Sequence, residues 1–293
     1  MPEISILDAE NRRDFVWPAP AKLNLFLHIT GRRADGYHEL QTVFQFLDKG
    51  DQLRFAPRDD GEIHRVGELV GVPEAQDMVV RAARLLQAES GCALGVDIHL
   101  QKHLPMGGGL GGGSSDAATT LVALNQLWGL NLPEDRLVEL GLKLGADVPV
   151  FVRGHAAWAE GVGEQLTPLD LPETWFMVLV PAVHVSTAEL FADPQLTRDA
   201  RPIRIRDFLA GAGTNVFEPL VRKRYREVDE ALTWLGQFSP ARLTGTGACV
   251  FAVFDTESVA RSVEAQVNRR WAVFVAPGRN RSPLHDALAQ FVS

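Results

Sequence analysis

Six glycines lie within residues 105–116, whose sequence is PMGGGLGGGSSD. Glycine adopts positive φ angles and lets a ligand approach the backbone closely. A helix is expected directly afterwards, because Ser115 or Asp116 can cap its start and apolar side chains recur on one face as far as Trp128. The free N–H groups and the positive dipole end of such a helix suit phosphate. We therefore predict an anion-binding loop rather than a flexible linker.

Other glycine-rich phosphate sites fit this loop poorly. A Walker loop requires Lys before its last Ser or Thr, whereas Gly113 precedes Ser114 here. Residues 107–112 match the G-x-G-x-x-G pattern of dinucleotide sites, but residues 101–106 separate them from the nearest expected strand. The His-Arg-Asp and Asp-Phe-Gly motifs of protein kinases do not follow. The loop is therefore expected to belong to another family, with an NAD-linked dehydrogenase as a remote alternative.

Composition restricts the class of partner. The chain has 293 residues, enough for two domains, and a formal net charge of −8. This charge and the lack of a Lys/Arg block argue against a nucleic-acid partner. Two cysteines, Cys92 and Cys249, give no disulfide framework and fit a reducing cytoplasm. Because no leader pattern or membrane-length apolar run is found, we expect a cytoplasmic protein with no membrane partner.

Apolar patterning predicts a mixture of strands and helices after a short N-terminal extension that ends at about Phe15. Strands are expected at residues 21–29, 42–47, 52–55, 96–100, 175–181 and 250–254. Besides the helix after the glycine loop, helices are expected at residues 77–87, 133–144, 223–235 and 256–269, and from about 186. Since the two kinds of element do not alternate strictly, an α+β fold is favoured over a doubly wound sheet.

Three segments together resemble the GHMP small-molecule kinases: PAKLNL at residues 20–25, the glycine loop, and LTGTGAC at residues 243–249. Further stretches narrow the resemblance to members that phosphorylate a cytidine diphosphate-linked methylerythritol. These are RADGYHELQTVF at 33–44, GADVPVF at 145–151 and SPLH at 282–285. The resemblance covers residues 17 to about 287. It implies a two-lobed fold, with a ribosomal-protein-domain-like N-terminal lobe at residues 1–167 and a ferredoxin-like C-terminal lobe at 168–293.

The resemblance also implies an activity. ATP and a small-molecule substrate would meet between the lobes, and the γ-phosphoryl group would pass to the 2-hydroxyl of the methylerythritol, in the non-mevalonate route to isoprenoid precursors. Asp147 matches the catalytic carboxylate and Lys22 the lysine beside it. The residues alone leave alternatives open: Asp147 can cap a turn before Pro149, and Lys22 can be a solvated strand lysine.

The resemblance assigns nucleotide binding to the glycine loop, whose backbone N–H groups would surround the phosphates. Mg²⁺ is expected with ATP, without dedicated protein ligands and with Ser115 as the one hydroxyl near the metal. Lys102, just upstream, is expected at the surface as an isolated lysine, with contact to the nucleotide as the alternative. The loop residues assigned to ATP are Pro105, Met106, Gly107, Gly108, Gly109, Leu110, Gly111, Gly112, Gly113, Ser114 and Ser115.

The substrate residues implied by the resemblance come from several segments. Tyr37 and His38 match the cytidine-binding pair, because an aromatic ring offers a stacking face and an imidazole can read the base edge. Phe191 matches a second aromatic residue that would sandwich the base; the alternative is an ordinary core phenylalanine. Asn24, on the strand face of Lys22, and Thr187 are further candidates. Residues 244–247 either close the far lobe onto the site or form a tight turn.

One residue departs from the family pattern. Asp77 stands where relatives often carry Asn near the adenine, and a carboxylate accepts hydrogen bonds but cannot donate them. We therefore expect altered nucleotide discrimination. Two other functions remain open: a GHMP kinase for another small alcohol, and a non-catalytic nucleotide sensor. The sequence does not indicate the oligomeric state.

Overall fold

The computed structural model describes residues 14–34, 36–267 and 269–293. Most of the expected N-terminal extension, Asp35 of the RADGYH stretch and Asn268 of the helix expected at 256–269 lie outside the described residues.

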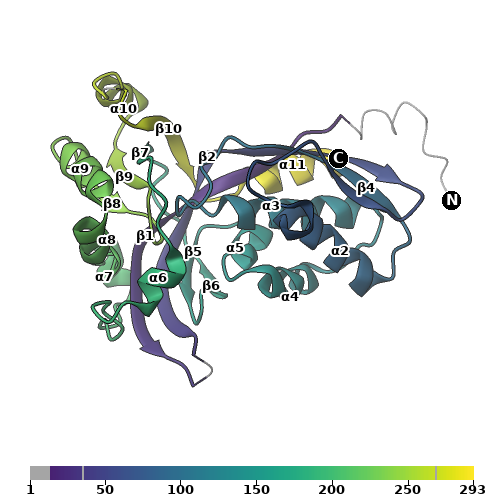
Figure 1. Ribbon diagram of the computed structural model, residues 1–293, viewed down its shortest axis with the longest axis horizontal. Helices are drawn as coiled ribbons and strands as arrows, with labels where there is room; N and C mark the ends of the chain where they lie inside the picture. The colour runs from purple at the N-terminus through teal and green to yellow at the C-terminus, as the bar shows by residue number, and fades with distance from the viewer. Residues whose placement is uncertain (1–13, 35, 268) are drawn as a thin grey trace.

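Two long antiparallel strands, β1 (Trp17–Arg32) and β2 (His38–Arg58), run from one lobe to the other (Figure 1). The side chains of the central residues point alternately to the two faces of the strand pair, and both faces are buried. In this register Lys22 lies opposite Phe46 and Asn24 lies opposite Phe44. The strands expected separately at residues 42–47 and 52–55 are one strand, because β1 pairs with both parts of β2. This pair carries the first candidate site residues into the middle of the molecule.

The N-terminal lobe is a sheet covered by helices on one face (Figure 1). Strand β2 pairs with β4 (Gly95–Gln101) and β5 (Ala157–Glu160). Strand β3 (Ile63–Val66) runs parallel to β4, and β6 (Gln165–Pro168) pairs with β5. The helices of this lobe are α2 (Met78–Ser90), α3 (Gly112–Leu127), α4 (Glu134–Leu144) and α5 (Val148–Arg153), with the short η1 (Glu74–Gln76) before α2. Helices α2 and α3 pack on the strands, whereas α4 packs on α2, α3 and α5.

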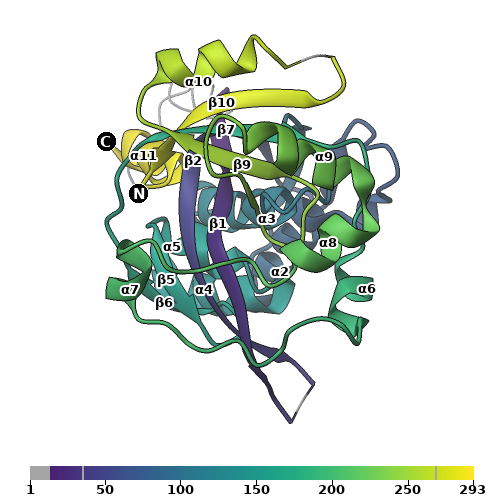
Figure 2. The same ribbon diagram turned by 90° about the vertical axis from the view of Figure 1, so that its left-hand side faces the viewer.

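The C-terminal lobe has its own antiparallel strands and core. Its strands are β7 (Trp175–Val180), β8 (Arg242–Leu243), β9 (Val250–Phe254) and β10 (Ala272–Arg279). Its helices are α6 (Thr187–Ala192), α7 (Ile205–Leu209), α8 (Glu218–Arg224), α9 (Arg226–Leu235) and α10 (Glu257–Glu264). Figure 2 looks onto this lobe, where α9 and α10 pack on the strands.

The last elements connect the two lobes. The end of β10 pairs with β2 through Gly278 and Arg279, so a single ten-stranded sheet spans the molecule. Helix α11 (Pro283–Val292) then packs on β1, with Leu284 in the core of the N-terminal lobe. A third apolar cluster, which includes Leu23, Leu110 and Phe251, lies where the lobes meet.

The α+β expectation is confirmed, whereas several element bounds were wrong. The helix expected at residues 223–235 is two helices, because Tyr225 is extended, with φ −123° and ψ 95°, and α8 ends before it. Helix α10 ends at Glu264, whereas the sequence had indicated a helix as far as residue 269. The division of the chain at residue 167 stays a prediction.

Candidate functional site

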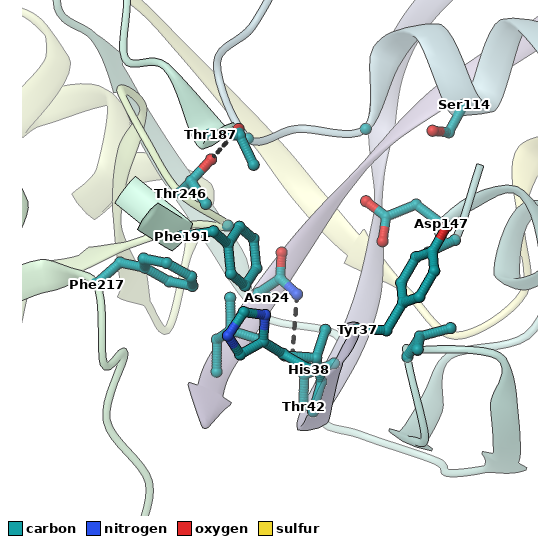
Figure 3. Close-up of a pocket in the computed structure, with 18 of the residues that line it drawn as sticks. Asn24, Tyr37, His38, Thr42, Ser114, Asp147, Thr187, Phe191, Phe217 and Thr246 are labelled. Carbon is teal, nitrogen blue, oxygen red and sulfur yellow. Dashed lines mark hydrogen bonds between the residues drawn. The ribbon is translucent and has the colours of Figure 1, made fainter. Parts of the chain in front are cut away.

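A cavity of about 880 Å³ lies between the lobes, and we call it the interlobe cavity. Its lining residues come from β1, β2, the glycine loop, the start of α5, α6 and the segment before β9. Figure 3 shows candidate residues from both lobes facing the same space. Segments that are far apart in the chain therefore meet at one place.

Lys22 and Asp147 form an ion pair at the wall of this cavity. The Lys22 Nζ lies 3.1 Å from the Asp147 Oδ2. The same ammonium donates to the Asn24 Oδ1 at 2.6 Å and to the Gly109 carbonyl at 3.3 Å. Lys22 is 2% exposed, so the alternative of a solvated lysine is wrong. A buried cation held by three acceptors has a fixed position.

Asp147 is placed by the start of α5. It is the residue before the helix, yet its side chain makes no capping hydrogen bond, and Pro149 occupies the first turn. The alternative of a turn cap is therefore wrong. Its side chain is 35% exposed and lines the interlobe cavity, while one oxygen faces Lys22. The other oxygen is thus available to a ligand in the cavity.

The glycine loop adopts backbone conformations that depend on its glycines. Gly107, Gly109 and Gly111 have φ angles of 71°, 78° and 72°. A side-chain carbon on Gly109 would lie 2.2 Å from the Thr244 carbonyl oxygen, so glycine lets the C-terminal lobe approach this loop. The Thr244 hydroxyl donates to the Gly109 carbonyl at 3.2 Å and accepts from the Asn24 N–H at 3.0 Å.

Helix α3 begins earlier than the capping residues indicated. It starts at Gly112, with the left-handed Gly111 before it, so Ser115 and Asp116 lie inside the first turns and the expected N-cap was wrong. The Ser115 side chain is fully buried and lines neither cavity at the loop, whereas Ser114 lines both. Ser114 is therefore the hydroxyl of this pair that faces a bound molecule.

A second cavity, of about 370 Å³, follows the outer side of the glycine loop, and we call it the loop-side cavity. Lys102 lines it and is half-buried, so its expected surface position was wrong. The Lys102 Nζ donates to the Asp116 Oδ2 at 2.7 Å and also to the Asp51 Oδ2. The other Asp51 oxygen accepts from the His103 and Leu104 N–H groups, which anchors the chain that leads into the loop.

Asp116 is buried and shares the Lys102 ammonium with Asp51. Burial and the neighbouring Asp51 carboxylate raise the pKa of Asp116, whereas the Lys102 ammonium opposes this shift.

Asp77 also lines the loop-side cavity, but both its oxygens already have donors. Its Oδ1 accepts from the Val79 N–H at 3.1 Å, capping α2, and its Oδ2 accepts from Arg65 at 2.7 Å. The sequence pattern did not indicate this partner, because Arg65 lies on a different element twelve residues earlier.

Two aromatic rings form one end of the interlobe cavity. The His38 and Phe191 rings have centroids 4.9 Å apart at an angle of 33°, and Phe217 packs edge-on behind Phe191 at 5.0 Å (Figure 3). Burial lowers the pKa of His38, and the nearby Arg198 and Arg32 lower it further. Tyr37 is 65% exposed and also lines the cavity.

Other polar residues complete the cavity. Thr187 and Thr246 share a hydrogen bond of 2.8 Å across the site. Thr42, which the sequence analysis did not single out, accepts from the Asn24 amide at 3.0 Å. Phe217 was also missed; as a single buried Phe outside any motif it carried no signal.

The described residues contain no cluster of three or more His, Cys, Asp or Glu side chains suited to a metal ion. Within that same part of the chain, no helix is both long and apolar enough to cross a membrane. The oxygen donors that line the cavity include the Asp147 carboxylate and the Ser114 hydroxyl, which are of the type that Mg²⁺ prefers.

Comparison with known families gives two matches. The family model described as "GHMP kinases N terminal domain" matches residues 77–155. The model described as "GHMP kinases C terminal" matches residues 194–273. The first match includes the glycine loop and Asp147, and the second includes residues 244–247.

Individual relatives are similar over most of the chain. A 4-diphosphocytidyl-2-C-methyl-D-erythritol kinase from Pseudomonas syringae pv. syringae (strain B728a) is 61% identical over 93% of this chain and 97% of its own. An enzyme of the same name from Nitrosococcus oceani (strain ATCC 19707) is 60% identical over 93% and 98%. A crystal structure of 4-(cytidine 5'-diphospho)-2C-methyl-D-erythritol kinase matches with a TM-score of 0.78 at 31% identity, over 90% of this chain and 98% of that one. A mevalonate kinase structure, 15% identical with a TM-score of 0.65 over 91% and 99%, shares the fold.

Proposed function

This chain belongs to the GHMP kinase family, and from that premise we propose that it transfers the γ-phosphoryl group of ATP to the 2-hydroxyl of 4-diphosphocytidyl-2-C-methyl-D-erythritol. The products are the 2-phosphate and ADP, within the methylerythritol phosphate route to isoprenoid precursors. The observation that carries this proposal is the ion pair between the buried Lys22 and Asp147, whose carboxylate faces a cavity shared by the glycine loop and an aromatic pair.

Asp147 serves as the group that orients the attacking hydroxyl and accepts its proton. The hydroxyl oxygen forms a bond to the γ-phosphorus while the bond to the β-phosphate oxygen breaks and ADP leaves. Lys22 holds the carboxylate in place at 3.1 Å and supplies positive charge where negative charge develops. Asn24 is fixed between Lys22 and Thr42, so its amide is presented to the cavity in one orientation.

The glycine loop serves as the phosphate site. Its backbone reverses at left-handed glycines and leads directly into α3, whose first N–H groups have no helical partner of their own. These donors and the helix dipole stabilise the polyphosphate. The nucleotide base then occupies the loop-side cavity.

Magnesium fits the oxygen donors present, which are the Asp147 carboxylate and the Ser114 hydroxyl. Phosphate oxygens and water would complete the coordination. When bound with ATP, Mg²⁺ neutralises charge on the transferred phosphoryl group. Ser114 therefore takes the role that the sequence had suggested for Ser115.

The cytidine end of the substrate is assigned to the aromatic end of the interlobe cavity. A flat base stacks favourably on aromatic rings such as those of Phe191 and Tyr37, which line this end of the cavity. The lowered pKa of His38 favours its neutral imidazole, which can both donate and accept at the base edge. Thr187 lies one turn before Phe191 on α6 and lines the same cavity.

A substrate comparison tests this assignment. ADP formation is measured with Mg-ATP and one acceptor at a time: 4-diphosphocytidyl-methylerythritol, mevalonate or homoserine. We expect turnover with the cytidine-linked acceptor and at least about a hundredfold lower kcat/KM with the others. Mevalonate and homoserine carry no cytosine, so the polar groups that bind the base would be left unpaired. Equal turnover of mevalonate or homoserine would replace this assignment with a GHMP kinase for another alcohol. ATP binding without turnover of any acceptor would favour the nucleotide sensor.

A further inference from the structure

Arg65 lies behind one wall of the loop-side cavity. It is on β3, and its side chain is 7% exposed. Its Nη1 donates to the Asp77 Oδ2 at 2.7 Å, and its Nη2 donates to the Val72 carbonyl at 3.3 Å. Its backbone N–H donates to the Glu74 carboxylate at 2.6 Å. Arg65 therefore fixes three points of the segment 72–77, and two of these residues line the cavity.

Asp77 connects this arrangement to helix α2. One carboxylate oxygen receives Arg65 and the other receives the Val79 N–H at the helix start. The Asp77 side chain is 5% exposed, so both charges of the pair are nearly removed from water. Removal of one partner of such a pair leaves an uncompensated buried charge, which the surrounding chain must move to solvate. The wall thus has one favoured position while the pair is intact.

We propose that the Arg65–Asp77 pair determines base selectivity at the nucleotide site by fixing this wall. The apolar part of the wall is formed by Leu69, Val72 and Met78. A wall held in one position distinguishes by shape between adenine, which carries a 6-amino group, and guanine, which carries a 6-oxo group and a 2-amino group. Asp77 holds the wall in place and does not bind the base itself, because both its carboxylate oxygens already accept hydrogen bonds from within the protein. This proposal rests on the proposed function, since it places the base of ATP in the loop-side cavity.

The test is the binding of ADP and GDP by titration calorimetry to the full chain and to Arg65→Met. We expect the variant to bind ADP about tenfold more weakly and its preference for ADP over GDP to fall about fivefold, while KM for the acceptor is unchanged. Equal weakening of ADP and GDP binding, or no change in either, would overturn the proposal. A parent protein that binds neither nucleotide would overturn the proposed function as well, which distinguishes the two failures.

Three further variants keep the result interpretable. Arg65→Lys retains the charge but lacks the forked contact to Val72, so we expect a smaller loss of the same selectivity in a folded protein. The double variant R65M/D77N removes both charges and should recover part of the ADP affinity that R65M loses. Arg136→Met removes a comparable pair at the other end of α2, where Arg136 binds Glu89 at 2.6 Å on the surface. An equal loss of selectivity in Arg136→Met would show a general effect on α2 and overturn the proposal.

Discussion

At the scale of single residues, the account depends on one carboxylate whose position is set by its neighbours. Asp147 faces the cavity, pairs with Lys22 and makes no hydrogen bond that the helix α5 requires. Removal of the Asp147 carboxylate is therefore expected to lower the reaction rate more than the stability of the fold.

We expect Asp147→Asn to lower kcat by about 10²- to 10⁴-fold, because the amide keeps the shape but cannot take the proton of the acceptor hydroxyl. Thermal stability should be retained, because the Asp147 side chain makes no capping hydrogen bond to α5. The control is Asp135→Asn, an aspartate that is 80% exposed and bound to Arg153 on the surface. A variant at position 147 with parental kcat would remove the assigned role.

Sequence patterns predicted the placement of some single residues correctly and of others incorrectly. Lys22 and Asn24 are two positions apart on a strand, so a common face was predictable, and the structure joins them directly. Ser115 was expected near the metal, but it is buried while Ser114 lines the cavity, because α3 starts at Gly112, before either serine. A helix start formed by glycine backbone leaves no such signal.

At the scale of elements, the glycine loop is shaped by contacts with the other lobe. The Gly108 carbonyl accepts from the Cys249 N–H at 3.1 Å, and Gly109 leaves no room for a side chain beside Thr244. The glycines of this loop therefore differ in how well they tolerate replacement by a residue with a side chain.

Gly109→Ala should weaken ATP binding by at least about tenfold, because its new carbon would lie 2.2 Å from the Thr244 carbonyl oxygen and its φ is 78°. Gly113→Ala is the matched control, since its new carbon would lie 3.7 Å from Met78 and the residue is helical. We expect the control to bind ATP normally and to be as stable as the parent or more so. Titration calorimetry and thermal unfolding measure both effects; equal binding by the two variants would contradict this account of the loop.

The SPLH segment connects α11 to the end of α5. The His285 imidazole hydrogen-bonds the Val152 carbonyl at 2.8 Å, and a side chain on Gly154 would collide with His285. Ser282 caps α11 and its N–H donates to the Gly154 carbonyl at 2.9 Å. Because α5 has only six residues, these contacts stabilise the helix that carries Asp147 at its start.

This contact predicts a pH-dependent stability. Burial lowers the pKa of His285, and the Val152 carbonyl only partly opposes the shift. The unfolded chain therefore takes up a proton near pH 6.5 before the folded protein does, so the stability contribution is present above pH 6.5 and is lost as the pH falls towards the folded pKa. We expect the advantage of the parent over His285→Gln in urea unfolding to shrink between about pH 8 and pH 5.5. A constant difference across this range would contradict the assignment.

At the scale of the whole molecule, the site exists because distant segments converge. The α+β class, the strands β1, β2, β4, β7 and β9 and the residues of the central pair follow from local patterns and the family resemblance, whereas β3, β5, β6, β8 and β10 were not expected. The continuity of the sheet through β10 and the return of α11 to the N-terminal lobe do not, because the order of elements in the chain says nothing about such pairings. The Arg65–Asp77 pair was missed for the same reason, since it joins different elements.

The most direct test of the central claim is ³¹P NMR of the purified protein with Mg-ATP and 4-diphosphocytidyl-methylerythritol. The account predicts a new phosphomonoester signal that grows as the γ-phosphate signal of ATP declines, in the parent protein and in Asp135→Asn but not at a comparable rate in Asp147→Asn. An ATP-binding, folded parent that gives no phosphomonoester signal would contradict it.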